Sequence, residues 1–173
     1  MQLENRKTAM KSTRNEWNSI VLRTSYLAED DKKEICSWKY EGDYEIYNLP
    51  SYEEMKNKKF GFMNPKYEQN FRTHYYNNLL VGFTNILEEE KEVFIGIGVN
   101  PGLCGKGYGK IILNEAYAIS KRLYPDKPLY LEVRTWNKRA INCYLKAGFK
   151  IDGEPYQLET AIGVGIFYRM IRE

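Results

Sequence analysis

A glycine-rich loop between an apolar strand and an amphipathic helix is the feature that most restricts how this sequence can fold. The stretch Val93–Val99 has the length of one buried strand, and glycines follow at positions 105, 107 and 109. A helix is predicted from about Gly107 to Leu123, where apolar residues recur on one face and Tyr124–Pro125 ends the pattern. Glycine permits close backbone approach, and the N–H groups of a helix N-terminus attract anions. The segment therefore predicts a pyrophosphate site, with a glycine-rich turn that binds nothing as the alternative.

Two familiar phosphate loops do not fit this spacing. A Walker loop needs a glycine five residues before Gly109 and Ser or Thr after Lys110, whereas this chain has Cys104 and Ile111 there. A dinucleotide-binding fingerprint needs G-x-G-x-x-G early in a parallel unit, whereas this chain has G-x-G-x-G after an antiparallel meander. A nucleotide-binding enzyme of either kind is therefore disfavoured.

The flanking patterns predict one mixed α/β domain with a largely antiparallel sheet. A two-residue hairpin turn is expected at Asn77–Asn78, because asparagine tolerates positive φ. No repeat or linker is visible, so we expect a flexible leader at 1–16 and a single domain over 17–173. The remaining predicted strands are Ile20–Thr24, Phe71–Tyr76, Leu79–Ile86, Leu129–Thr135, Phe149–Asp152 and Val164–Ile171, and the remaining helices lie near 27–34, 51–58 and 137–147.

Composition argues against several kinds of partner. The 173 residues contain 26 Lys and Arg against 23 Asp and Glu, and the resulting net charge of +3 is too weak to propose nucleic acid. No apolar run approaches the ~18–20 residues that cross a bilayer, and the start has no export signal, so we expect a cytoplasmic protein. Three widely spaced cysteines indicate reduced thiols, and the single histidine, His74, is expected to be half-buried in a strand. No metal site is predicted.

Two segments together resemble the GCN5-related N-acetyltransferase (GNAT) superfamily. The family's acetyl-CoA motif, V-x-P-x-x-(R/Q)-G-x-G-x-G/A, matches at Val99, Pro101, Gly105, Gly107 and Gly109. A later motif, N-x-x-A-(I/x)-x-x-Y-x-x-x-G-F, matches at Asn137, Ala140, Ile141, Tyr144, Gly148 and Phe149. The resemblance covers about residues 93–150 in the correct order and spacing, and it is closest in motif to the ribosomal-protein-alanine N-acetyltransferases.

The resemblance implies a GNAT-like α+β domain whose mostly antiparallel sheet splays at the cofactor cleft, with helices on both faces. The pantetheine arm of acetyl-CoA would pair there with the backbone of Ile97, Gly98 and Val99. The residues expected to hold the rest of the cofactor are Cys104, Gly105, Lys106, Gly107, Tyr108, Gly109, Lys110 and Asn137. Cys104 departs from the family pattern, which has Arg or Gln there. It is either a passive small residue or a reactive thiol.

Acetyl transfer to an amine needs a base for the amine and an acid for the departing thiolate. Tyr144 is the predicted acid, because the family often places a tyrosine hydroxyl beside the cofactor sulfur. A core aromatic is the alternative. Glu132 is the predicted base, as the resemblance to the ribosomal-protein-alanine subgroup implies, and burial would raise its pKa. The alternatives are a surface Glu132 paired with Arg134 on the same face, and Glu92 as the base.

Carboxylates alternate with aromatic residues before the first apolar strand of the meander, and this pattern suits a cationic amine. Trp38, Tyr40, Glu41 and Tyr44 are the predicted acceptor residues, with an ordinary amphipathic surface as the alternative. The predicted function is acetyl transfer from acetyl-CoA to a primary amine, carried by a small molecule or a peptide N-terminus. A non-catalytic acyl-CoA-binding or regulatory module is the alternative, and a homodimer is left open.

Overall fold

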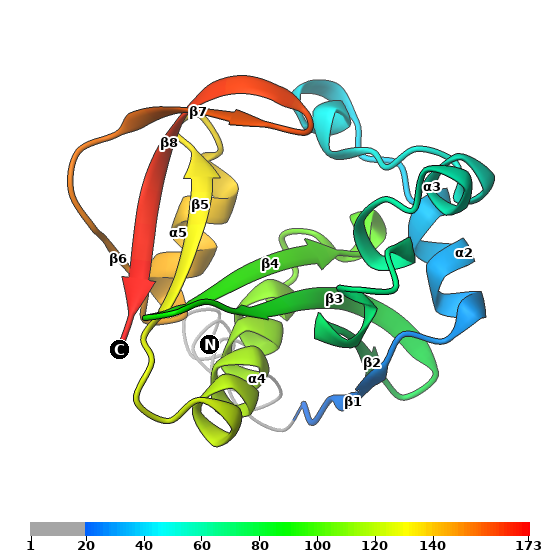
Figure 1. Ribbon diagram of the computed structural model, residues 1–173, viewed down its shortest axis with the longest axis horizontal. Coiled ribbons are helices and arrows are strands. Elements are labelled where there is room, and N and C mark those ends of the chain that lie inside the picture. Colours follow the sequence, from blue (N-terminus) through cyan, green and yellow to red (C-terminus); the bar gives the residue numbers. More distant parts are fainter. Residues whose placement is uncertain (1–19) are drawn as a thin grey trace, which may run out of the picture.

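An eight-stranded sheet, splayed open near its middle, organises residues 20–173, which are the residues that the computed structural model describes (Figure 1). The strand order is β1-β2-β3-β4-β5-β8-β6, and β7 also pairs with β8. The predicted leader at 1–16 lies outside the described residues. The strands are β1 (Arg23–Tyr26), β2 (Phe71–Tyr76), β3 (Leu79–Glu88), β4 (Val93–Val99), β5 (Leu129–Arg134), β6 (Lys150–Ile151), β7 (Tyr156–Thr160) and β8 (Gly163–Arg172).

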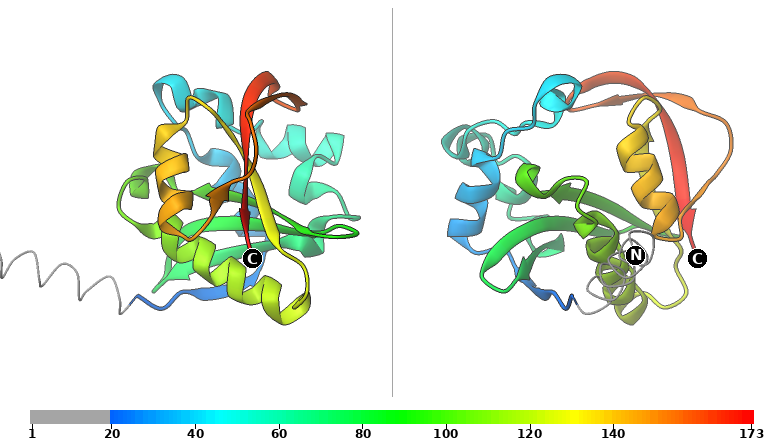
Figure 2. Two further views of the ribbon diagram at one scale, coloured as in Figure 1. Left: turned by 90° about the vertical axis from the view of Figure 1, so that its left-hand side faces the viewer. Right: turned by 180° about the vertical axis from the view of Figure 1, so that it is seen from behind.

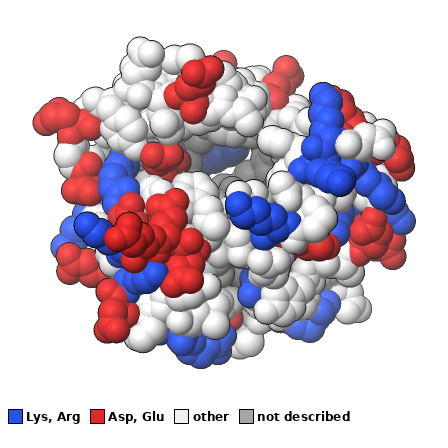
Figure 3. Space-filling view, in the orientation of Figure 1, with Lys and Arg blue, Asp and Glu red and all other residues white. Residues whose placement is uncertain are grey.

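Every neighbouring pair of strands is antiparallel except β4 and β5, which confirms the mostly antiparallel sheet. The parallel pairing of β4 with β5 covers only Val93 with Leu129 and Phe94 with Tyr130. Beyond these pairs the two strands diverge, so the sheet forms two arms (Figure 1). The space-filling view of the same face is hollowed between them (Figure 3).

Helices pack on both faces of the sheet, as predicted. The helices are α2 (Glu29–Ser37), α3 (Tyr52–Lys58), α4 (Tyr108–Leu123) and α5 (Lys138–Lys146), with short 3-10 turns η1 (Gly42–Tyr47), η2 (Gly61–Met63), η3 (Glu68–Asn70) and η4 (Pro101–Leu103). Apolar residues of α4 and α5 pack on β3, β4, β5 and β8, whereas α2 and α3 pack with β2 and β3 in a second core cluster. Figure 2 shows α5 and α3 on opposite sides of β8. None of the helices in the described part of the chain is long and apolar enough to cross a membrane.

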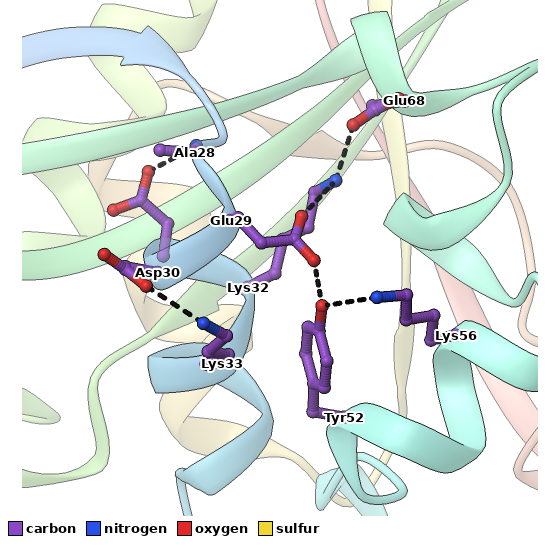
Figure 4. Close-up of polar contacts among 9 residues, drawn as sticks. Ala28, Glu29, Asp30, Lys32, Lys33, Tyr52, Lys56 and Glu68 are labelled. Atoms are coloured by element: carbon purple, nitrogen blue, oxygen red, sulfur yellow. Dashed lines mark hydrogen bonds and ion pairs between the residues drawn. The ribbon is translucent and has the colours of Figure 1, made fainter.

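A buried lysine ties α2 to the segment before β2 (Figure 4). The Nζ of Lys32 lies 3.4 Å from a Glu29 carboxylate oxygen and also pairs with Glu68, although the Lys32 side chain is only 8% exposed. Burial by itself lowers the pKa of Lys32, but the two carboxylates outweigh it, so the pKa is raised above its ordinary value and the charge is kept. Tyr52 of α3 donates to Glu29, which joins the two helices. This network fixes the chain that leads into the region around residues 38–49.

Three sequence expectations need correction. The first strand is Arg23–Tyr26, not Ile20–Thr24, because β2 selects by antiparallel pairing which residues of this short run enter the sheet. Strand β7 was not predicted; only alternate residues along it are exposed, and its pairing with β8 defines it. The spacing of Ile141, Tyr144 and Leu145 predicts one apolar stripe on their helix, but Leu145 is 46% exposed. By contrast, the positive φ of Asn77, +55°, confirms the predicted hairpin turn.

His74 is fully buried in β2, not half-buried as expected. Its Nδ1 lies 3.0 Å from the Thr24 hydroxyl and its Nε2 lies 2.9 Å from the Thr84 hydroxyl, so hydroxyls on β1 and β3 satisfy both ring nitrogens. Burial, helped by the charge of Arg72, lowers the pKa of His74 from 6.5 to about 4. The ring is therefore neutral in the folded protein at neutral pH.

We expect His74 to make the fold sensitive to acid. Between pH 6.5 and about 4 the unfolded chain binds a proton on His74 that the folded protein does not, so stability falls as the pH falls through this window. The lowered pKa of His74 corresponds to a loss of roughly 3 kcal/mol in the free energy of unfolding across this window. Urea unfolding from pH 7 to pH 4 should show a steeper loss for the wild type than for His74→Gln, because the carboxylates titrate alike in both. Parallel curves would contradict this account.

Candidate active site

The splay between β4 and β5 opens a cleft of about 640 Å³. The Val93 N–H donates to the Pro128 carbonyl at 2.9 Å, on the β5 side of β4. The N–H and C=O groups of every second residue point to the same side of a strand. Those of Ile97 and Val99 therefore point to the same side as those of Val93, where β5 has already diverged. This edge of β4 can pair with an extended ligand in place of a strand.

The glycine loop forms one end of this cleft. Gly105 and Gly107 adopt φ of +78° and +86°, which only glycine adopts at little cost, and they lead directly into α4. Neither glycine donates a backbone hydrogen bond to the described part of the chain. The N–H groups of Gly109 and Lys110, in the first turn of α4, have no acceptor within the helix. The loop thus presents N–H donors and a helix N-terminus to the cleft, which is the arrangement that a pyrophosphate needs.

Most of the predicted cofactor residues line the cleft, namely Ile97, Gly98, Val99, Cys104, Gly105, Gly107, Gly109, Lys110 and Asn137. Lys106 and Tyr108 do not line it, and the Tyr108 ring packs 6.2 Å from that of Tyr76. The Asn137 side chain has two other partners. Its Oδ1 accepts from the Ala140 N–H at 3.1 Å as the N-cap of α5, and its Nδ2 donates to the Tyr47 hydroxyl at 3.2 Å.

Tyr144 lines the cleft from α5, and its ring lies 6.4 Å from Phe149. No hydrogen bond of its hydroxyl is found within residues 20–173, so the proton is available to a ligand. Burial raises the pKa of Tyr144 well above its ordinary value, and the hydroxyl is therefore protonated at neutral pH. The core packing and the acid role that the sequence left as alternatives are compatible here.

Glu132 lines the same cleft from β5, between the buried Leu131 and Val133. The hydroxyl of Tyr156, on β7, donates to its Oε1. Arg134 does not pair with Glu132. Its guanidinium instead donates to the Val164 carbonyl at 3.1 Å and to other carbonyls of the turn between β7 and β8.

Glu92, the alternative base, does not line the cleft. Both of its carboxylate oxygens accept from Arg169, and Arg169 also donates from Nε to Asp152 at 3.0 Å. A carboxylate held by a two-pronged ion pair is a poor acceptor for a substrate proton. Within the described residues, no cluster of three or more His, Cys, Asp or Glu side chains could hold a metal ion.

Comparison with known proteins decides the family. Residues 32–149 match the model of the acetyltransferase (GNAT) family. The chain belongs to this family. Curated proteins give no match to the sequence.

Solved GNAT-type structures share the fold at low sequence identity. A GNAT-family acetyltransferase from Bacillus anthracis superposes with a TM-score of 0.71 at 15% identity, over 87% of this chain and 93% of that one. Spermidine N-acetyltransferase from Vibrio cholerae, in complex with CoA and spermine, gives 0.66 at 19% identity, over 87% and 94%. The aminoglycoside enzyme AAC(6')-Ib, in complex with ribostamycin and coenzyme A, gives 0.63 at 18% identity, over 87% and 92%. These neighbours support the single-domain GNAT fold and acetyl-CoA as the cosubstrate.

Cys104 occupies the GNAT motif position that usually holds Arg or Gln. Its Sγ lies 3.8 Å from the Val99 carbonyl oxygen, and burial raises the pKa of the thiol despite the charge of Arg139. A thiol with a raised pKa is a poor nucleophile at neutral pH, which favours the passive role over the reactive one. Lys110 and Arg139 line the cleft near this loop and can supply the positive charge that the cysteine lacks.

Residues 38–49, which we call the strap, join the two arms of the GNAT sheet across the cleft. Tyr40 donates from its hydroxyl to the Val99 carbonyl at 2.8 Å on the β4 arm, whereas Tyr47 accepts from Asn137 on the other arm. Trp38 and Tyr40, both predicted for the acceptor, line the cleft. Glu41 is exposed and does not line it. Tyr44, also outside it, packs 5.6 Å from Trp136.

Two contributors to this site were missed from the sequence. Tyr47 stood among the aromatic residues before α3, but nothing local connected it to Asn137, ninety positions later in the chain. Tyr156 lies on the unpredicted strand β7, and its contact with Glu132 depends on that strand's pairing with β8. An alternation of aromatic and polar residues was the signal for Tyr47, whereas Tyr156 had no such signal.

Gly109 should prove to be a packing residue as well as part of the loop. A Cβ at this position would lie 2.8 Å from the Cys143 Sγ on α5, closer than a real contact allows. We therefore expect Gly109→Ala to destabilise the wild type by about 1–2 kcal/mol, and to become neutral or stabilising in a Cys143→Ala background. Chemical unfolding of the double-mutant cycle measures this coupling. Gly102→Ala is the control, since its Cβ would meet Asn100 at an ordinary 3.5 Å. Equal costs of Gly109→Ala in both backgrounds would refute the contact.

Proposed function

We propose that this GNAT-family protein transfers the acetyl group of acetyl-CoA to a primary amine by direct attack, with Glu132 as the base and Tyr144 as the acid. The observation that carries the proposal is that both side chains, from β5 and α5, line the cleft that the glycine loop closes at one end. The spermidine and aminoglycoside enzymes with the same fold act on amines, which supports the acceptor class. The pairing of glutamate with tyrosine is also what the resemblance to the ribosomal-protein-alanine subgroup predicts.

The cleft offers a place for each part of the cosubstrate. The amides of Gly105, Gly107 and Gly109 would hold the pyrophosphate, with Lys110 adding charge. Backbone groups of Ile97 and the N–H of Val99 would pair with the pantetheine arm, since the Val99 carbonyl already accepts from Tyr40. Acetyl-CoA supplies a thioester that is already activated, so the protein needs no covalent intermediate of its own.

Each proton in the reaction has a place in the cleft. Glu132 takes the proton that makes the amine an ammonium ion, and the free nitrogen lone pair then forms the new N–C bond. As the C–S bond breaks, Tyr144 donates its hydroxyl proton to the sulfur, and the second amine proton restores the tyrosine through solvent. Tyr156 holds Glu132 in place through its hydrogen bond. Burial and the Glu132 carboxylate raise the pKa of Tyr156 to about 12, so it remains a donor at working pH.

Tyr144→Phe should lower kcat by ~100-fold, because it removes the proton donor and leaves the ring packing intact. The dissociation constant of acetyl-CoA should change less than ~2-fold, since the ring and the loop amides remain. Steady-state thiol release measures kcat, and titration calorimetry measures the dissociation constant of acetyl-CoA. An unchanged kcat would remove Tyr144 from the acid role.

Glu132→Gln should abolish the low-pH limb of the kcat/KM profile, because the amide cannot accept the amine proton at any pH. The matched control is Glu92→Gln, which should keep the limb, since Glu92 is paired with Arg169 outside the cleft. Loss of the limb in the control instead would assign the base to Glu92.

A non-catalytic acyl-CoA-binding module is the second candidate, because Cys104 departs from the family motif. Calorimetry with acetyl-CoA followed by thiol release over an amine panel separates the two. Binding without turnover of any amine would favour the module. The homodimer and the cytoplasmic location stay predictions.

A further inference from the structure

Four of the five charged residues that line the cleft are cations. The cations are Lys110, Arg134, Arg139 and Lys146, and the single acid is Glu132. Lys110 lies in the first turn of α4, at the pyrophosphate end, and Arg139 and Lys146 belong to α5. Arg134 is buried and committed to the carbonyls of the β7–β8 turn. An amine therefore meets one carboxylate in this cleft.

Three acids outside the cleft are already paired. Glu92 and Asp152 both pair with Arg169. Glu89 accepts from the Tyr130 hydroxyl at 3.1 Å. Glu41, the strap acid predicted to bind the acceptor, is exposed and does not line the cleft. A second ammonium group in the cleft would consequently lose its hydration without gaining a carboxylate.

Aromatic side chains form the walls on the Glu132 side of the sheet. Phe94 pairs with Tyr130, which shares the face of Glu132 by alternation along β5. Phe167 pairs with Arg134 and so lies on this face as well.

Two more rings extend this wall along the β4 arm. Phe83 lies over Gly98, where a Cβ would stand 2.2 Å from its ring. Trp38 packs 6.1 Å from Phe83. Trp38, Phe83, Phe94 and Phe167 all line the cleft and give it apolar walls.

We infer that the acceptor is a small amine with one positive charge and a flat apolar body, such as an arylalkylamine. This inference rests on the acetyl transfer proposed above and names its substrate class. The ammonium group pairs with Glu132 before it gives up its proton, and the apolar body packs between Phe94 and Phe167. Burying further ammonium groups among aromatic rings without partners is costly. The cleft therefore disfavours polyamines, unlike the spermidine enzyme that shares its fold.

The test compares kcat/KM for 2-phenylethylamine, spermidine and a serine-initiated peptide at saturating acetyl-CoA. We expect 2-phenylethylamine to exceed each of the others by at least ~10-fold. Acetylation of spermidine or the peptide in preference to 2-phenylethylamine would overturn the acceptor class and leave acetyl transfer intact. Binding of acetyl-CoA without turnover of any of the three would overturn both.

A variant pair separates the cleft from general effects on the protein. Phe94→Glu adds a second carboxylate to the wall, so the ratio of kcat/KM for 2-phenylethylamine to that for spermidine should fall by at least ~10-fold. Phe60→Glu is the matched control, because Phe60 is 41% exposed and does not line the cleft, and it should leave the ratio unchanged. Circular dichroism confirms folding. Phe94→Leu keeps this wall apolar but removes the aromatic ring, so it should also lower the ratio. An unaltered ratio in both Phe94 variants would contradict the inference.

Discussion

The short parallel contact between β4 and β5 is the constraint on which the rest of this protein depends. Two residue pairs join the strands, and past Phe94 and Tyr130 the arms separate. A sheet opened in this way leaves backbone groups of β4 without a strand partner, which is unfavourable unless something else pairs with them. One apolar cluster spans β4, β5, α4 and α5 and keeps the two arms in place from behind. The strap closes the gap from the other side, and its Tyr40 satisfies the Val99 carbonyl.

Some contacts that shape the cleft require a glycine, because a side chain at that position would overlap the contacting residue. Arg134 can reach the β7–β8 turn because Gly165 has no side chain. A Cβ on Gly165 would stand 2.0 Å from the Arg134 Nη1 and would block this contact. That contact keeps Arg134 away from Glu132 and leaves the carboxylate to Tyr156. The charge at the acceptor end thus depends on a glycine in a different strand. Packing and chemistry are coupled here through van der Waals space.

Local sequence patterns predicted most of the helices and strands, because these elements depend mainly on residues close together in the chain. The glycine loop, the positive φ of Asn77 and the N-cap of α5 each follow from a few adjacent residues. The cleft is different, since the contacts of Tyr47 with Asn137 and of Tyr156 with Glu132 join segments far apart in the chain. Carboxylates among aromatic residues were the basis for the predicted acceptor residues in 38–49. Periodicity could not tell that Trp38, Tyr40 and Tyr47 line the cleft while Glu41 is exposed and does not.

The cleft contains four cations and one carboxylate, and in the proposed reaction these charges would orient both substrates. Amides, Lys110 and Arg139 make the glycine-loop end attractive to an anion, in spite of the cysteine at position 104. Glu132 is the one carboxylate among the residues that line the cleft, and the neighbouring Arg134 is held by carbonyls of the β7–β8 turn. In the proposed reaction, a cosubstrate with phosphates would favour the glycine loop and an amine would favour Glu132. Tyr144, which lines the same cleft and has a raised pKa, would add the proton donor.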